Sequence, residues 1–126
     1  YLASRYGKGP VLIAEIAEQK KIPIKFLENI LLQLKVKKIL GSKKGKGGGY
    51  FLEIDPKKIP IAAALRIIEG PIAMLPCVSL NFYEKCEDCN EKTCGLNKVM
   101  AATRDATLKV LEKKTLADLA DGSSTR

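Results

Sequence analysis

Residues 13–34 read IAEIAEQKKIPIKFLENILLQL, two short amphipathic segments on either side of a break at Pro23. The first segment predicts a short helix over Val11–Lys20. Its apolar residues Ile13, Ile16 and Ala17 follow the i, i+3, i+4 spacing of a single helix face.

A second helix is expected from Pro23, which fits the first turn of a helix, to about Val36. Its buried face is expected to consist of Leu27, Ile30, Leu31 and Leu34. Two short helices joined by such a tight break predict a helix-turn-helix.

The hydrophobic period changes after the second helix. Residues 39–44 and 50–54 are strand-like, and the glycine-rich stretch 45–49 separates them. Glycine reaches positive φ without steric cost, so this stretch predicts the turn of a β-hairpin. Asp55-Pro56 ends the hairpin.

The second half predicts a helix from Pro60 to Glu69, an irregular cysteine-bearing loop over 71–95, and a long helix from Leu96 to about Lys113. Residues of the long helix recur at spacings of 3 and 4, the pattern of a seam between two paired helices. The predicted seam, widened by one methionine, is Leu96, Val99, Met100, Thr103, Ala106 and Val110.

The two ends of the chain carry weaker signals. Tyr1–Gly7 predicts the end of a helix whose start is absent, Thr115 and Asp118 predict one short capped turn, and residues 122–126 are expected to fray.

The predicted fold class is mainly α with a small β-hairpin wing: a winged helix-turn-helix plus a long C-terminal dimerisation helix. Three regions are expected. Residues 1–58 form the winged helix-turn-helix domain, 59–95 the connecting helix and cysteine loop, and 96–126 the dimerisation helix and tail.

Charge is partitioned between the two halves of the chain. The 126 residues carry 22 Lys and Arg against 14 Asp and Glu, a net charge of +8. Residues 1–58 hold 13 of these basic residues and 5 of the acids, whereas residues 59–126 hold 9 of each. A polyanion-binding module beside a neutral assembly module accounts for this partition better than a scattered solubilising surface does.

Residues 20–46 carry nine lysines and a single acid, Glu28. In a helix that enters a major groove, the first turns face base edges while flanking lysines neutralise phosphates. Glu28 opposes non-specific phosphate binding but can accept from a cytosine amino group. The alternative is a solvated lysine face on an ordinary helical domain. The predicted DNA-contacting residues are Lys25, Phe26, Glu28, Asn29, Ser42, Lys43, Lys44 and Lys46.

All four cysteines fall in the spacing C-x8-C-x2-C-x4-C, formed by Cys77, Cys86, Cys89 and Cys94. Four thiolates in one loop can hold tetrahedral zinc or an iron–sulfur cluster, and the spacing does not choose between them. A disulfide framework and free thiols are the alternatives.

Several function classes are disfavoured. Histidine is absent and neither phosphate-loop motif is present, so an enzyme would have to rely on a cysteine nucleophile with no identifiable base. No apolar run approaches the roughly 20 residues that span a bilayer, so we expect a cytoplasmic protein without a membrane partner. An electron-transfer module, with lysines docking an acidic partner, is a further alternative.

These segments together resemble the IscR/NsrR/CymR family of bacterial winged-helix transcription regulators. The resemblance covers nearly the whole chain. It rests on residues 13–17, 26–31, the wing stretch 42–50, Glu69-Gly70-Pro71 before the cysteines, and Cys94-Gly95-Leu96 at the start of the long helix, which ends in residues 115–119.

The resemblance implies a homodimeric DNA-binding repressor on a palindromic operator, with crossing long helices and a cysteine-ligated [2Fe-2S] or [4Fe-4S] cluster that senses redox state, nitric oxide or iron–sulfur status. It makes Glu28 the base-reading acid and Lys44 the counterpart of an arginine that enters the minor groove. Cys77, Cys86 and Cys94 match the family's three-cysteine pattern, which leaves Cys89 as an extra or substitute ligand. The chain departs from the family at Lys38, commonly a turn glycine, and in having no histidine after the third cysteine.

Overall fold

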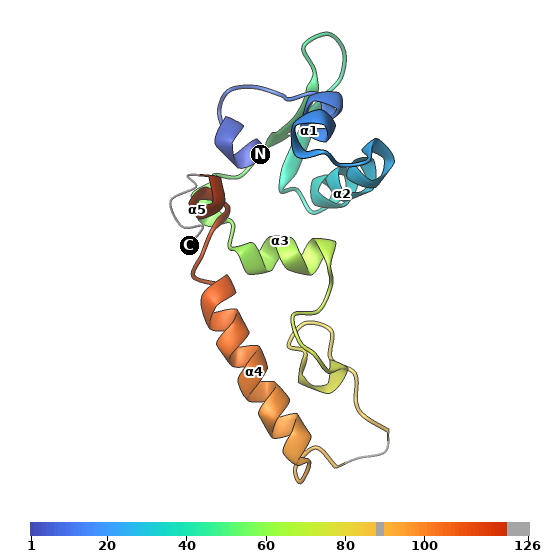
Figure 1. Cartoon of the computed structure of the whole chain (residues 1–126), viewed down its shortest axis with the longest axis vertical. Helices are drawn as coiled ribbons and strands as arrows, with labels where there is room; N and C mark the ends of the chain where they lie inside the picture. The colour runs from blue at the N-terminus through green and yellow to red at the C-terminus, as the bar shows by residue number, and fades with distance from the viewer. Residues whose placement is uncertain (88–89, 121–126) are drawn as a thin grey trace. The chain divides into compact units, whose positions relative to one another are not determined.

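The computed structural model describes residues 1–87 and 90–120 and divides them into two compact units (Figure 1). Unit 1 contains residues 1–60 together with the described residues from Thr115 onward, and unit 2 contains residues 61–114. The architecture is mostly helical, with one antiparallel hairpin. This confirms the predicted fold class.

Unit 1 contains the two short helices predicted from the sequence, α1 (Ile13–Lys20) and α2 (Ile24–Val36). The two helices pack on each other, and Ile16 of α1 and Leu27 and Leu31 of α2 are buried. The other two residues expected on the buried face of α2, Ile30 and Leu34, are half-buried.

Both helices of this pair end in the same way, in a left-handed residue that is a lysine. After α2, Lys38 has φ +63°, its amide donates to the carbonyl of Lys35, and the Ile39 amide donates to the carbonyl of Leu34. This is the Schellman arrangement, in which glycine is the usual left-handed residue. Lys21, at φ +53°, occupies the same position after α1. The replacement of the family's turn glycine by Lys38 therefore leaves the helix exit intact.

The predicted hairpin is present as β1 (Leu40–Lys43) and β2 (Gly49–Leu52), which pair with Leu40 opposite Leu52 and Lys43 opposite Gly49. The prediction of helix from Val11 onward is wrong at its first residues. Val11 is extended and exchanges two 2.8 Å backbone hydrogen bonds with Tyr50, so it adds a third short pairing to the hairpin.

Gly49 makes that pairing possible. Its φ is +142°, and a Cβ placed on it would lie 2.3 Å from the carbonyl oxygen of Val11. A side chain at this position would therefore force the two backbones apart.

The remaining parts of unit 1 come from the two ends of the chain. The predicted helix end at Tyr1–Gly7 is instead a 3-10 turn, η1 (Leu2–Arg5), and the Tyr1 hydroxyl donates to Glu15 of α1 at 2.5 Å. The turn η2 (Pro56–Lys58) follows the hairpin, and the short helix α5 (Leu116–Ala120) packs on both η1 and η2.

The predicted cap of α5 is also present. The Thr115 amide donates to the Asp118 carboxylate at 2.8 Å, and Thr115 forms an isolated antiparallel bridge with Pro60. The predicted fraying of residues 122–126 lies outside the described residues.

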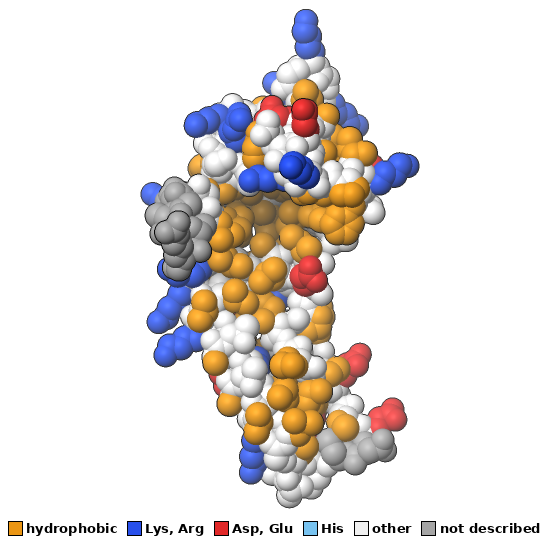
Figure 2. Space-filling view, in the orientation of Figure 1, with side chains coloured by type: hydrophobic (Ala, Val, Ile, Leu, Met, Phe, Trp, Pro, Cys, Tyr) orange, Lys and Arg blue, Asp and Glu red, His pale blue; other side chains and the backbone are white. Residues whose placement is uncertain are grey.

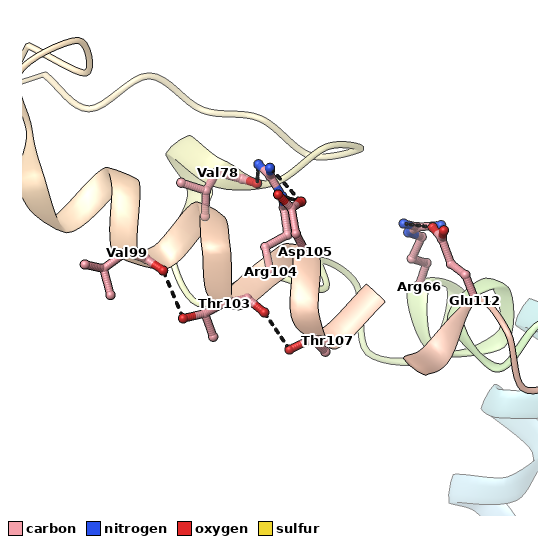
Figure 3. Close-up of polar contacts among 8 residues, drawn as sticks. All are labelled: Arg66, Val78, Val99, Thr103, Arg104, Asp105, Thr107 and Glu112. Carbon is pink, nitrogen blue, oxygen red and sulfur yellow. Dashed lines mark hydrogen bonds and ion pairs between the residues drawn. The ribbon is translucent and has the colours of Figure 1, made fainter. Parts of the chain in front are cut away.

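Unit 2 contains α3 (Ile61–Ile68), the 3-10 turn η3 (Pro76–Val78) and the long helix α4 (Gly95–Leu111). The described residues between α3 and α4 are otherwise irregular, as predicted. Helix α4 is joined to α3 by the Arg66–Glu112 ion pair at 3.5 Å and to η3 by Arg104, as Figure 3 shows. Among the described residues, the helices are all too short or too polar to cross a membrane.

Candidate functional site

The exposed face of α2 carries the residues expected to read bases. Lys25, Glu28 and Asn29 stand at i, i+3 and i+4 and share one face of the helix, and all three are exposed. Phe26 lies on the flank of this face and is 61% exposed. The structure thus leaves all four predicted residues of α2 exposed to solvent.

The hairpin presents a second group of basic side chains. Lys43, Lys44 and Lys46 are exposed, and Lys44 and Lys46 alternate with Gly45 and Gly47, which have φ values of +91° and +77°. Figure 2 shows Lys and Arg side chains (blue) projecting around this unit, including the end of the hairpin. Ser42, the remaining predicted residue, is half-buried and lies opposite Tyr50 in the sheet register.

Three of the four predicted metal ligands line one pocket in unit 2. Cys77, Cys86 and Cys94 are half-buried, free thiols around a pocket of about 340 Å³. Cys89, the fourth predicted ligand, lies outside the described residues. The other residues that line the pocket are Leu75, Pro76, Glu84, Lys85, Leu96 and Asn97.

Two of the sulfur atoms share a hydrogen-bond donor residue. Cys94 is the N-cap of α4, and its Sγ accepts from the main-chain amide of Asn97 at 3.4 Å. The side-chain amide of the same Asn97 donates to Sγ of Cys77, also at 3.4 Å. Cys77 belongs to η3, so Asn97 connects the 3-10 turn to the first turn of the long helix.

The three described thiols line one pocket, but they are not close enough together to bind one metal ion. Within 1–87 and 90–120, the Cys, Asp and Glu side chains form no group of three or more close enough to hold a metal ion. Hydrogen bonds from Asn97 reach Cys77 and Cys94, and Cys86 lines the same pocket. Ligation of one metal ion by all three thiols therefore needs these side chains to move closer together.

The outer face of α4 is the predicted helix seam. Leu96, Val99 and Val110 are 57%, 58% and 59% exposed, and Thr103 and Ala106 on the same face are exposed as well. The inner face contains Leu108, which is only 6% exposed. Met100, which was expected to widen the seam, is half-buried and lies closer to the inner face. Figure 2 shows hydrophobic side chains (orange) gathered over this part of unit 2.

Thr103 fits an apolar seam because its hydroxyl is already paired. It donates to the carbonyl of Val99 at 3.0 Å, and Thr107 donates to the carbonyl of Thr103 at 2.9 Å (Figure 3). A hydroxyl satisfied within its own helix can be covered without the penalty of an unpaired polar group.

Two residues at this site were not among those predicted. Asn97 could have been found, since it stands three residues after Cys94, where an N-cap side chain meets the backbone of its helix. Arg104 carries no comparable sequence signal. Its guanidinium donates to the carbonyl of Val78 at 2.8 Å and pairs with Asp105, which only the fold reveals.

Comparison with known proteins gives matches along nearly the whole chain. A sequence model of the Rrf2 family, described as iron-dependent transcriptional regulator, matches residues 1–122. An HTH-type transcriptional regulator of Rhodobacter capsulatus, described as Rrf2-like, is 38% identical over 118 residues, which are 93% of this chain and 79% of that protein.

Two solved structures share the fold. CymR, described as the global cysteine regulator of Bacillus subtilis, is 29% identical with a TM-score of 0.77 over 98% of this chain and 87% of its own. IscR of T. potens is 25% identical with a TM-score of 0.73 over 98% of this chain and 77% of its own. The relatives are named as transcriptional regulators and not as enzymes, in agreement with the sequence-based expectation.

Proposed function

Because this chain belongs to the Rrf2 family of transcriptional regulators, we propose that it acts as a homodimeric repressor whose cysteine pocket binds an iron–sulfur cluster and senses redox state, nitric oxide or iron–sulfur status. The observation that carries the proposal is that three cysteines separated by up to 17 positions in sequence line one pocket at the start of α4. We further propose that the protein works in the cytoplasm, where its operator DNA lies.

The proposed DNA-binding region is residues 1–58. Lys25, Glu28 and Asn29 form one exposed face of α2 and would meet base edges in the major groove. Phe26 at the edge of that face would contact a base methyl group or the sugar backbone. The hairpin lysines 43, 44 and 46, with Ser42, would contact phosphates or enter the adjacent minor groove.

Dimerisation is proposed through residues 96–126, along the outer face of α4. Leu96, Val99, Thr103, Ala106 and Val110 repeat at the spacing that lets two helices pack side by side. More than half of each large apolar side chain on this face is exposed in the single chain. Two copies related by a twofold axis would place two α2 helices on successive major grooves, roughly 34 Å apart, and would require a palindromic operator.

The cysteine pocket fits a cluster or zinc by the chemistry of its donors. Thiolate sulfur is the preferred ligand of both, and N–H groups directed at sulfur stabilise it in the ligating form. Cys77, Cys86 and Cys94 are the described ligands, and Cys89 completes a four-thiol set in sequence. When bound, an iron–sulfur cluster supplies an oxidisable centre that these residues lack on their own.

The chain itself provides the connection between the pocket and the dimer face. Cys94 caps α4, so a change at its sulfur alters the hydrogen bond to Asn97 in the first turn. That same turn carries Leu96, and the next carries Val99, the first two residues of the proposed seam. The thiols therefore lie within one to two helical turns of the proposed dimer face. Ligation of the pocket switches DNA binding only if the ligated pocket favours one dimer geometry over another.

The experiment that tests the proposal combines metal analysis with DNA binding. Protein purified without oxygen should contain stoichiometric iron and acid-labile sulfide, show visible absorption bands, and shift a palindromic duplex in a competition assay. Cys77→Ser should lose the cluster, while Lys92→Ala, an exposed substitution in the same loop, should keep it.

Three results would argue against the proposal. Stoichiometric zinc without sulfide indicates a structural metal site, and neither metal nor sulfide indicates free thiols. A cluster in a monomer that ignores duplex DNA indicates an electron-transfer module.

A further inference from the structure

Asn97 stands between two of the three pocket sulfurs and donates to both. Its side-chain Nδ2 is 3.4 Å from Sγ of Cys77, and its main-chain nitrogen is 3.4 Å from Sγ of Cys94. The two cysteines come from different elements, η3 and the N-cap of α4. Among the pocket residues that the structure describes, no other donates a hydrogen bond to sulfur.

An N–H group directed at sulfur favours the anionic over the neutral form. A thiol sulfur is a weak acceptor, whereas a thiolate is a strong one and is also the form that binds metals. Donors in the outer shell of a metal site orient the ligands and raise the affinity for the metal. Asn97 is placed to orient Cys77 and Cys94 in this way.

The position of Asn97 argues against a role in helix stability alone. Asparagine is a weak helix former, and this one lies within the first turn of α4 with its side chain turned to a sulfur of another element. The cap of α4 is the hydrogen bond from the main-chain amide of residue 97 to Cys94. A different side chain at position 97 would leave that amide in place.

We propose that Asn97 is a positioning residue for the metal group of the cysteine pocket, an inference that rests on the proposed function. It holds Cys77 and Cys94 as a prepared pair for a thiophilic cation, with Cys86 as the third described ligand. The side-chain amide is not itself a ligand, because its donor nitrogen faces the sulfur.

The test uses Cd²⁺, whose bonds to thiolates absorb in the ultraviolet, titrated into the reduced, metal-free full chain. Asn97→Leu keeps the number and branching of the side-chain heavy atoms but removes the donor, and we expect about a tenfold loss of Cd²⁺ affinity. Asn97→Gln keeps an amide and should recover part of that loss. Lys98→Ala, an exposed neighbour on the same helix outside the pocket, should bind as the parent does.

Circular dichroism confirms that each variant is folded before its affinity is compared. Parental affinity in both Asn97→Leu and Asn97→Ala would overturn the inference and leave the proposed function intact. A second outcome is that the protein, purified without oxygen, contains no iron or sulfide but binds Cd²⁺ tightly in a way that depends on Asn97. That result would support the inference and overturn the proposal of an iron–sulfur cluster. A parent that does not bind Cd²⁺ at all overturns both.

Discussion

Nη1 of Arg104 donates a 2.8 Å hydrogen bond to the main-chain carbonyl of Val78, the residue that follows Cys77. Because the Arg104 side chain is only 17% exposed, water competes weakly for this bond. Arg104 therefore fixes η3, and with it Cys77, against the middle of α4.

Replacing Arg104 by Met keeps most of the side-chain length and removes the charged donor. We expect unit 2 to lose about 1.5–3 kcal/mol of stability, the range for hydrogen bonds to charged groups. Urea unfolding of the metal-free protein measures this loss. Asp105→Asn is the matched control, because the Asp105 carboxylate is 65% exposed and its ion pair should contribute less than about 1 kcal/mol.

Val99→Glu tests the proposed dimer face. A carboxylate at position 99, within the α4 seam, would be buried without a partner in the dimer, so we expect the dimer to dissociate into monomers. Light scattering after size-exclusion chromatography reports the mass. Lys109→Glu changes charge on the flank of the same helix and should leave the mass unchanged. A dimeric Val99→Glu protein places the interface elsewhere.

Glu28→Ala tests base reading by α2. Discrimination at one position of each half-site should fall by about 1–3 kcal/mol, because the carboxylate accepts from one base edge. Competition binding with single-base operator variants measures the change. Glu18→Ala removes an exposed acid from α1 and serves as the control. An unchanged preference at every position would remove Glu28 from the interface.

Lys44→Ala tests the wing. If Lys44 neutralises one phosphate per subunit, the slope of log affinity against log salt concentration should become shallower by about 0.9 for each phosphate that is no longer neutralised. Affinity should fall nearly equally for all sequences. Lys109→Ala, outside the proposed DNA-binding region, is the control and should keep the parental slope. A parental slope for Lys44→Ala as well would show that the hairpin tip stays in solvent.

Lys38→Gly tests the exit of α2. Lys38 adopts φ +63°, which costs an L-residue with a side chain roughly 1–2 kcal/mol and costs glycine nothing. We expect the variant to be about 1 kcal/mol more stable in urea, since glycine also loosens the unfolded chain. Lys37→Gly, one residue earlier at φ −84°, should be destabilising. If both variants change the free energy of unfolding in the same direction, this explanation of the α2 exit is wrong.

Much of the fold follows from local sequence pattern. The helix pair, the hairpin around residues 45–49 and the Thr115–Asp118 cap depend on neighbouring residues, and each was predicted. Val11 was predicted as helix and is extended, because its partner is Tyr50, 39 positions away. The residues next to Val11 in the sequence do not indicate that it pairs with Tyr50.

The candidate site divides in the same way. The exposure of Lys25, Glu28 and Asn29 follows from helix periodicity, and the shared pocket of Cys77, Cys86 and Cys94 was anticipated by their closeness in sequence. The contacts of Asn97 and Arg104 depend on how η3 lies against α4, a tertiary packing that periodicity does not encode. Lys38 shows the reverse case, a residue unsuited to its backbone conformation that the surrounding hydrogen bonds hold in place.

The bridge between Pro60 and Thr115 makes unit 2 topologically an insertion. The chain leaves unit 1 at Pro60 and re-enters it at Thr115. If unit 2 were removed, the two ends to be joined would therefore already be neighbours. A shortened chain in which a few glycines replace residues 61–114 would close a very short loop and retain the helix pair, the hairpin and α5. The same junction would also accept a different inserted domain in place of unit 2.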